Sequence, residues 1–128
     1  MTKEQKFYQW FRKQLPINSD ITRIETSTMG GVPDTNICVA GQETWVELKC
    51  YEGGRVLIRP QQNAWGHRRT AAGGRVFIIA EHASGEVHAW NFPRIMVTTH
   101  GKYLHLTNAP YVVTGPQCGK HLINYLFT

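Results

Sequence analysis

The sequence lacks any apolar run long enough to cross a membrane. Its longest uninterrupted apolar stretch runs only from Val76 to Ala80, whereas a membrane-spanning helix needs about 20 apolar residues. The N-terminal segment MTKEQKFYQW also lacks the apolar core of a signal peptide. We therefore expect a cytoplasmic protein with no membrane partner.

Clustered metal ligands and nucleotide-binding motifs are also absent. The three cysteines, Cys38, Cys50 and Cys118, form no Cys-x-x-Cys pair, and the histidines show neither helical pair spacing nor a cysteine partner. Neither a phosphate-binding loop nor a dinucleotide-binding fingerprint occurs. These absences argue against a disulfide framework, a zinc site and a nucleotide cofactor.

Acidic residues are missing from two long segments. No Asp or Glu occurs from Gly53 to Ala80, and none follows Glu86. A polyanion such as DNA or RNA would meet little repulsion there, although a solvated basic face has the same composition. The formal net charge is +5, and the first acid-free segment carries Arg55, Arg59, Arg68, Arg69 and Arg75.

A chain of 128 residues is long enough for one domain with a buried core. Periodicity and turn residues predict helices over 2–16, 60–72 and 118–127. They predict strands over 20–27, 34–39, 43–49, 75–81 and 85–92, with a short strand within 52–58. We expect a single domain over 1–128, with a core over about 2–91 and a C-terminal extension over 92–128.

The order of these elements predicts the fold class. The segment RVFIIAE, at 75–81, is typical of a buried central strand, and GEVHAWNF, at 85–92, of an edge strand beside it. The strand at 43–49, the helix at 60–72 and the strand at 75–81 form a crossover that we expect to be parallel and right-handed. The prediction is an α/β fold with an α-β-β-β-α-β core and a mixed central sheet flanked by helices.

Two acids and a lysine fall on neighbouring predicted strands. If Ala40 and Gly41 form a two-residue turn, Asp34 lies opposite Glu47, and Lys49 shares their face because side chains alternate along a strand. A loop longer by two residues would instead place Asp34 opposite Lys49 and keep the three groups together.

Opposed carboxylates repel, with their Cβ atoms about 5 Å apart. Lys49 would compensate part of this repulsion, and a bridging divalent cation such as Mg²⁺, which prefers oxygen ligands, would compensate the rest. The alternative is an ordinary surface salt bridge between Lys49 and one of the acids.

This arrangement resembles the signature of the PD-(D/E)xK nucleases. Asp34 of GVPD precedes Glu47 of ELK by thirteen residues. The segment from Ile21 to Glu81 is similar to small phage and bacterial members, near the virus-type replication-repair nucleases and the Holliday-junction resolvases. The resemblance implies a restriction-endonuclease-like fold whose core has the element order predicted above.

The resemblance also implies roles for single residues. Asp34 and Glu47 correspond to metal ligands, the main-chain carbonyl of Leu48 to a third ligand, and Lys49 to the catalytic lysine. Gln62 matches a glutamine that many members hold near the site on the following helix. The alternative for Gln62 is an exposed helix residue.

Many members add a further acid, for which two residues are candidates. Glu25 precedes the glycine loop that leads into Asp34, and it could equally pair with Arg23 or Arg55. Glu4 is the candidate on the first helix, where an acid is also favoured by the helix dipole. We rank Glu25 ahead of Glu4.

The resemblance therefore implies a nuclease that uses Mg²⁺ or Mn²⁺ to hydrolyse DNA phosphodiester bonds in a bacterial or phage-infected cell. We expect an endonuclease selective for junctions or branched DNA, because so small a chain has little surface for reading bases. Cleavage of both strands favours a homodimer. The alternative is a non-cleaving nucleic-acid-binding or inhibitory module on the same fold. The expected phosphate contacts are Arg55, Arg59, Arg68 and Arg69.

Overall fold

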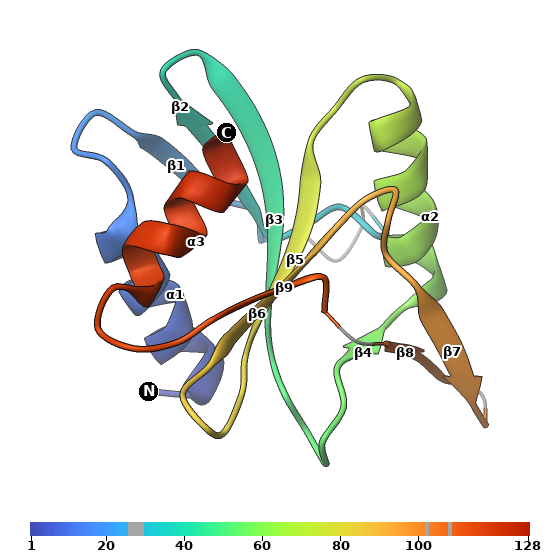
Figure 1. The fold of residues 1–128 in the computed structure, drawn as a ribbon. Helices are drawn as coiled ribbons and strands as arrows, with labels where there is room; N and C mark the ends of the chain where they lie inside the picture. Colours follow the sequence, from blue (N-terminus) through green and yellow to red (C-terminus); the bar gives the residue numbers. More distant parts are fainter. Residues whose placement is uncertain (26–29, 102, 108) are drawn as a thin grey trace.

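The computed structural model describes residues 1–25, 30–101, 103–107 and 109–128 (Figure 1). Its helices are α1 (Lys3–Gln14), α2 (Pro60–Ala71) and α3 (Cys118–Phe127). Its strands are β1 (Asp20–Arg23), β2 (Thr35–Val39), β3 (Gln42–Cys50), β4 (Leu57–Ile58), β5 (Val76–Glu81), β6 (Val87–Asn91), β7 (Val97–His100), β8 (Tyr103–Leu106) and β9 (Tyr111–Val113). The strand predicted over 20–27 is β1, and positions 26 and 27 lie outside the described residues.

A six-stranded mixed sheet forms the centre, in the order β1-β2-β3-β5-β6-β9. Its neighbouring strands are antiparallel except for β3 and β5, which are parallel and are connected through α2. The predicted mixed α/β sheet and its parallel crossover are confirmed.

The α1 and α3 helices cover one face of this sheet (Figure 1). The Thr2 side chain accepts a hydrogen bond from the Gln5 N–H, which caps α1 and sets its start. Phe7 and Phe11, one turn apart, are buried against the sheet, as their spacing predicts. Leu122 and Leu126 of α3 complete this half of the core.

The opposite face packs against α2 and a small second sheet. That sheet has the order β4-β8-β7. Trp65 of α2, Ile58 of β4 and Leu106 of β8 are buried with Ile78 and Trp90 from the central sheet. The α2 helix is thereby packed against the central sheet, where it contacts β5.

One strand prediction is wrong. The segment around β6 is an inner strand, because β9 pairs with it on the side away from β5. β7, β8 and β9 were not predicted, since strands of three or four residues leave little periodicity to detect. The helix predicted over 118–127 is α3 with the same limits.

The β2–β3 hairpin has the predicted register. Thr35 pairs with Val46 and Val39 with Gln42, so that Ala40 and Gly41 form the two-residue turn. Both turn residues have positive φ, at 50° and 82°, which is the backbone of a tight hairpin turn that follows the twist of the strands.

Within the described residues, none of the helices combines the length and the apolar character that crossing a membrane would require.

Candidate active site

Asp34, Glu47 and Lys49 lie on the α2 side of the sheet. Val46 and Leu48 of β3 are buried on the opposite side, in the core under α1 and α3, so the alternating side chains of Glu47 and Lys49 face α2. Asp34 directly precedes β2 and continues its register with β3. The hairpin geometry therefore brings the three groups together as the sequence predicted.

Hydrogen bonds fix the two carboxylates against each other. The Asp34 N–H donates to Glu47 Oε1 at 3.0 Å. Asp34 Oδ1 in turn accepts from the Thr35 hydroxyl at 2.9 Å and from the Leu48 N–H at 3.3 Å. Each carboxylate thus receives a backbone donor from the other strand, which holds both acids in place.

Burial and mutual repulsion make this pair of acids reluctant to ionise. Burial, reinforced by the negative charge of Asp34, raises the pKa of Glu47 from 4.5 to about 7. Burial also raises the pKa of Asp34, against the Thr35 hydrogen bond and the charge of Arg23. A bound cation would relieve both effects, because it would favour the ionised forms.

The Lys49 amine is shifted in the complementary direction. Burial, helped by the nearby Arg59 guanidinium, lowers the pKa of Lys49 below its ordinary 10.5, while the charges of Glu47, Glu4 and Asp34 oppose that shift. A larger fraction of the amine is therefore neutral near neutral pH than for an exposed lysine. A neutral amine can accept a proton from water.

Gln62 of α2 is buried, with 6% of its surface exposed, so the exposed alternative is excluded. Its Oε1 accepts from the Arg59 N–H at 2.9 Å, and together with Gly31 and Glu47 it lines a small cavity. Gly31 lies so close to α2 that a Cβ there would be 2.2 Å from the Gln61 carbonyl oxygen. The loop before Asp34 is thus packed onto the first turn of α2, next to Glu47.

The two candidates for a further acid lie in different places. Glu4, in the first turn of α1, is among the groups whose charge acts on Lys49. Glu25 is exposed after β1 and lines a separate pocket with residues of α1, including Tyr8 and Arg12. The electrostatic coupling of Glu4 to Lys49 gives it the stronger link to the site.

Arg23 is a further residue of the site, and the sequence alone did not predict it there. Its Nη2 lies 3.9 Å from Asp34 Oδ2, and its guanidinium carbon lies 4.4 Å from the centre of the Tyr8 ring. Pairing of Arg23 with Thr35 across β1 and β2 brings it there. Only the β1–β2 register could have revealed this contact, and no turn signal in the sequence fixes that register.

The four predicted phosphate-binding arginines are all exposed, but they do not form one cluster. Arg59 lies at the start of α2, and its charge acts on both Glu47 and Lys49. Arg68 and Arg69 lie in the last turn of α2. Arg55 lies in the turn that leads into β4, where it pairs through its backbone with Glu52. Of the four arginines, Arg59 is therefore the one whose charge acts on the candidate site, at Glu47 and Lys49.

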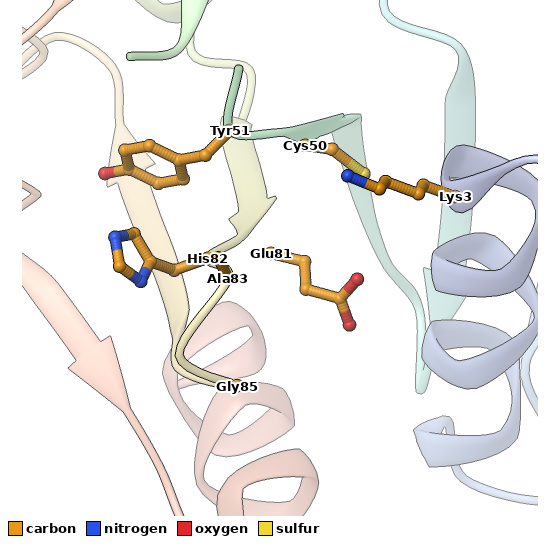
Figure 2. Close-up of a pocket in the computed structure, with 7 residues that line it drawn as sticks. All are labelled: Lys3, Cys50, Tyr51, Glu81, His82, Ala83 and Gly85. Atoms are coloured by element: carbon orange, nitrogen blue, oxygen red, sulfur yellow. The ribbon is translucent and has the colours of Figure 1, made fainter. Parts of the chain in front are cut away.

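A larger pocket, of about 330 Å³, lies beside the site at the carboxyl ends of β3 and β5. In Figure 2 the rings of Tyr51 and His82 lie on one side of the strand ends and the side chains of Cys50 and Glu81 on the other. Burial raises the pKa of the Cys50 thiol, so it is a poor nucleophile. The pocket itself contains none of the three site groups.

His88, whose ring stacks on that of the pocket residue His82, is held by contacts at both of its ring nitrogens. The Tyr51 hydroxyl and His88 Nδ1 are 2.7 Å apart, and His88 Nε2 lies 2.9 Å from Glu86 Oε1. Both ring nitrogens of His88, on β6, are thus engaged by neighbouring side chains.

The chemistry of the donor set fits a hard divalent cation. Asp34 and Glu47 offer carboxylate oxygens side by side, and Leu48, whose carbonyl is the third candidate ligand, lies next to Glu47 in β3. Among the described residues there is no group of three or more His, Cys, Asp or Glu side chains that could hold a metal. Two carboxylates suffice for Mg²⁺, which keeps several waters and completes its shell with substrate phosphate.

Comparison with known proteins identifies the fold. No family model and no curated protein matches the chain. Among solved structures, it is similar to Hjc, a Holliday junction resolvase from the archaeal hyperthermophile Archaeoglobus fulgidus, with a TM-score of 0.57 and 8% sequence identity. The similarity covers 82% of this chain and 87% of the resolvase chain. The chain therefore has the α/β, restriction-endonuclease-like fold of that resolvase.

Proposed function

We propose that this protein is a divalent-metal-dependent nuclease that hydrolyses phosphodiester bonds in DNA. The observation that carries the proposal is the contact between the partly buried acids Asp34 and Glu47, with Lys49 on the same face, on a resolvase-like fold. A salt bridge on the surface would not need two partly buried carboxylates that repel each other. A site that binds a divalent cation beside a general base does need such carboxylates, because they are its ligands.

The residues divide the chemistry between them. Asp34, Glu47 and the Leu48 carbonyl would hold Mg²⁺ or Mn²⁺, which would lower the pKa of a bound water and neutralise charge on the phosphate. Lys49 takes the proton of the attacking water at Nζ while the water oxygen bonds to phosphorus. The bond from phosphorus to the leaving oxygen breaks, and that oxygen takes a proton from solvent. Arg59 contacts the phosphate oxygens.

The substrate is proposed to be branched DNA. The similar solved structure is a Holliday junction resolvase. The chain has a net charge of +5, which suits recognition of the DNA backbone and its shape. Symmetric cleavage of two strands requires two sites, so we propose that the active form is a homodimer.

A substrate panel tests this function. The purified protein is incubated with a four-way junction, a three-way flap, linear duplex, single-stranded DNA and RNA, each with Mg²⁺, with Mn²⁺ and with EDTA. We expect cleavage of the branched DNA with either metal and none with EDTA. Binding without cleavage of any substrate under any metal would contradict the nuclease and support a non-cleaving nucleic-acid-binding module.

A further inference from the structure

A second basic feature, formed by Arg68 and Arg69, lies at the end of α2 farther from the candidate site. Arg59 precedes the helix and Arg69 lies in its last turn, ten residues on. At about 1.5 Å per residue, this places them about 15 Å apart along the helix axis. The second feature is therefore separate from Arg59, which we propose to contact the cleaved phosphate.

Two tryptophans hold the Arg69 side chain. Its guanidinium carbon lies 4.8 Å from the centre of the Trp65 ring and 5.5 Å from that of Trp45. The two rings contact each other edge to face, with centres 5.3 Å apart. The attraction of the guanidinium charge to the two rings needs no hydrogen-bond acceptor. Arg69 is thus held in place by the two rings while it keeps its positive charge.

Gly74 provides the room for this arrangement. A Cβ at Gly74 would lie 2.7 Å from Arg69 Cγ and 2.9 Å from its Cδ. Gly74 is not among the glycines with positive φ, so the close approach of the arginine, and not the backbone conformation, explains the glycine. The aliphatic part of Arg69 therefore packs against Gly74.

The charge of this feature is not neutralised by an acid. Among the described residues, the ion pairs join Arg23 with Asp34 and His88 with Glu86, and neither involves α2. The helix contains no acidic residue. An open pocket of about 330 Å³ lies here, and it is lined by Trp65, Arg68, Arg69 and Ala72. A positively charged guanidinium that is held in such a pocket suits an anion.

We propose that this pocket binds a backbone phosphate of the duplex arm that flanks the cleavage position. The proposal rests on the proposed function and adds to it a second phosphate contact at a fixed distance. At about 3.4 Å of rise per nucleotide, 15 Å corresponds to about four nucleotides from the phosphate that Arg59 contacts. A duplex is stiff enough to keep that spacing, so α2 selects substrates with a paired arm of at least this length.

DNA binding in EDTA tests the proposal independently of cleavage. Affinity for a junction with duplex arms is measured by fluorescence anisotropy over a range of salt concentrations. In the Arg69→Gln variant we expect the slope of log affinity against log salt to fall by about 0.9, as for loss of one phosphate contact. Gly74→Ala, which keeps the charge but displaces the side chain, is expected to change the slope in the same direction. Lys120→Gln on α3, an exposed position on the opposite layer, is the control for loss of one charge.

Single methylphosphonate replacements locate the phosphate. In the wild-type protein, one replacement about four nucleotides from the cleavage position should weaken binding, and the same replacement should have no effect in Arg69→Gln. Equal salt slopes for wild type and Arg69→Gln, with thermal melts showing that both are folded, would overturn the proposal. If the slopes differ as expected but no substrate is cleaved, the nuclease function fails while the phosphate contact stands.

Discussion

Asp34→Asn and Glu47→Gln are each expected to lower the rate of DNA cleavage by roughly a thousandfold or more. Each substitution keeps the size of the side chain and removes one negative charge from the cation site. The Asp34 N–H holds the Glu47 carboxylate and the Leu48 N–H holds the Asp34 carboxylate, so each acid is fixed in its own position and neither can replace the other. Single-turnover cleavage of a branched substrate with Mg²⁺ measures the effect.

Glu43→Gln is the matched control for these variants. Glu43 lies on β3 on the same face as Glu47, four residues earlier, and it is exposed. Its substitution should change the cleavage rate by less than about twofold, as expected for a surface position. An Asp34→Asn variant that keeps the wild-type rate would show that the acids do not act in the reaction.

Glu47→Gln is expected to stabilise the metal-free protein at pH 8 but not at pH 4.5. The pKa of Glu47 is about 7 in the folded protein, against 4.5 ordinarily, so the folded state retains a proton that the unfolded state has lost between these values. The contribution of this group to stability therefore falls as pH rises from about 4.5 to 7 and stays low above that. At about 1.4 kcal/mol per pH unit, the variant should gain on the order of 3 kcal/mol in unfolding free energy at pH 8.

Urea unfolding in EDTA at the two pH values measures this difference. Glu43→Gln again serves as the control, because its exposed position should give the same small change at both pH values. A constant difference between wild type and Glu47→Gln from pH 4.5 to pH 8 would contradict the raised pKa. Addition of Mg²⁺ should restore stability to the wild type alone, since the cation favours the ionised carboxylates.

The site could be predicted where local rules determine it. The two turn residues Ala40 and Gly41 fix the β2–β3 register, and the register places Asp34 and Glu47 side by side. The crossover through α2 follows from the apolar segment that forms β5 and the helix before it. In both cases the residues of a short segment are sufficient to predict the local structure.

Contacts between distant segments could not be predicted in the same way. The pairing of Arg23 with Thr35 and the closeness of Glu4 to Lys49 depend on where β1 and α1 pack, and no motif encodes that. The stacking of Arg69 on Trp45 needs α2 to lie across β3 in one orientation. Tertiary packing sets these positions, and it is specified by the core as a whole.

The position of β6 shows the same limit at the level of the sheet. Its composition indicated an edge strand, yet β9, more than twenty residues later, covers that edge. The three residues of β9 give no periodic pattern of their own. Their place depends on α3, which packs into the core beside them.

Titration with Mn²⁺, followed by the loss of the free-ion signal in electron paramagnetic resonance, tests the carboxylate pair most directly. We predict that the wild-type protein binds Mn²⁺ in the absence of DNA, that Glu43→Gln binds it equally well, and that Asp34→Asn and Glu47→Gln bind it at least about tenfold more weakly. Undiminished Mn²⁺ binding in both Asp34→Asn and Glu47→Gln would contradict the assignment of these residues as the metal site.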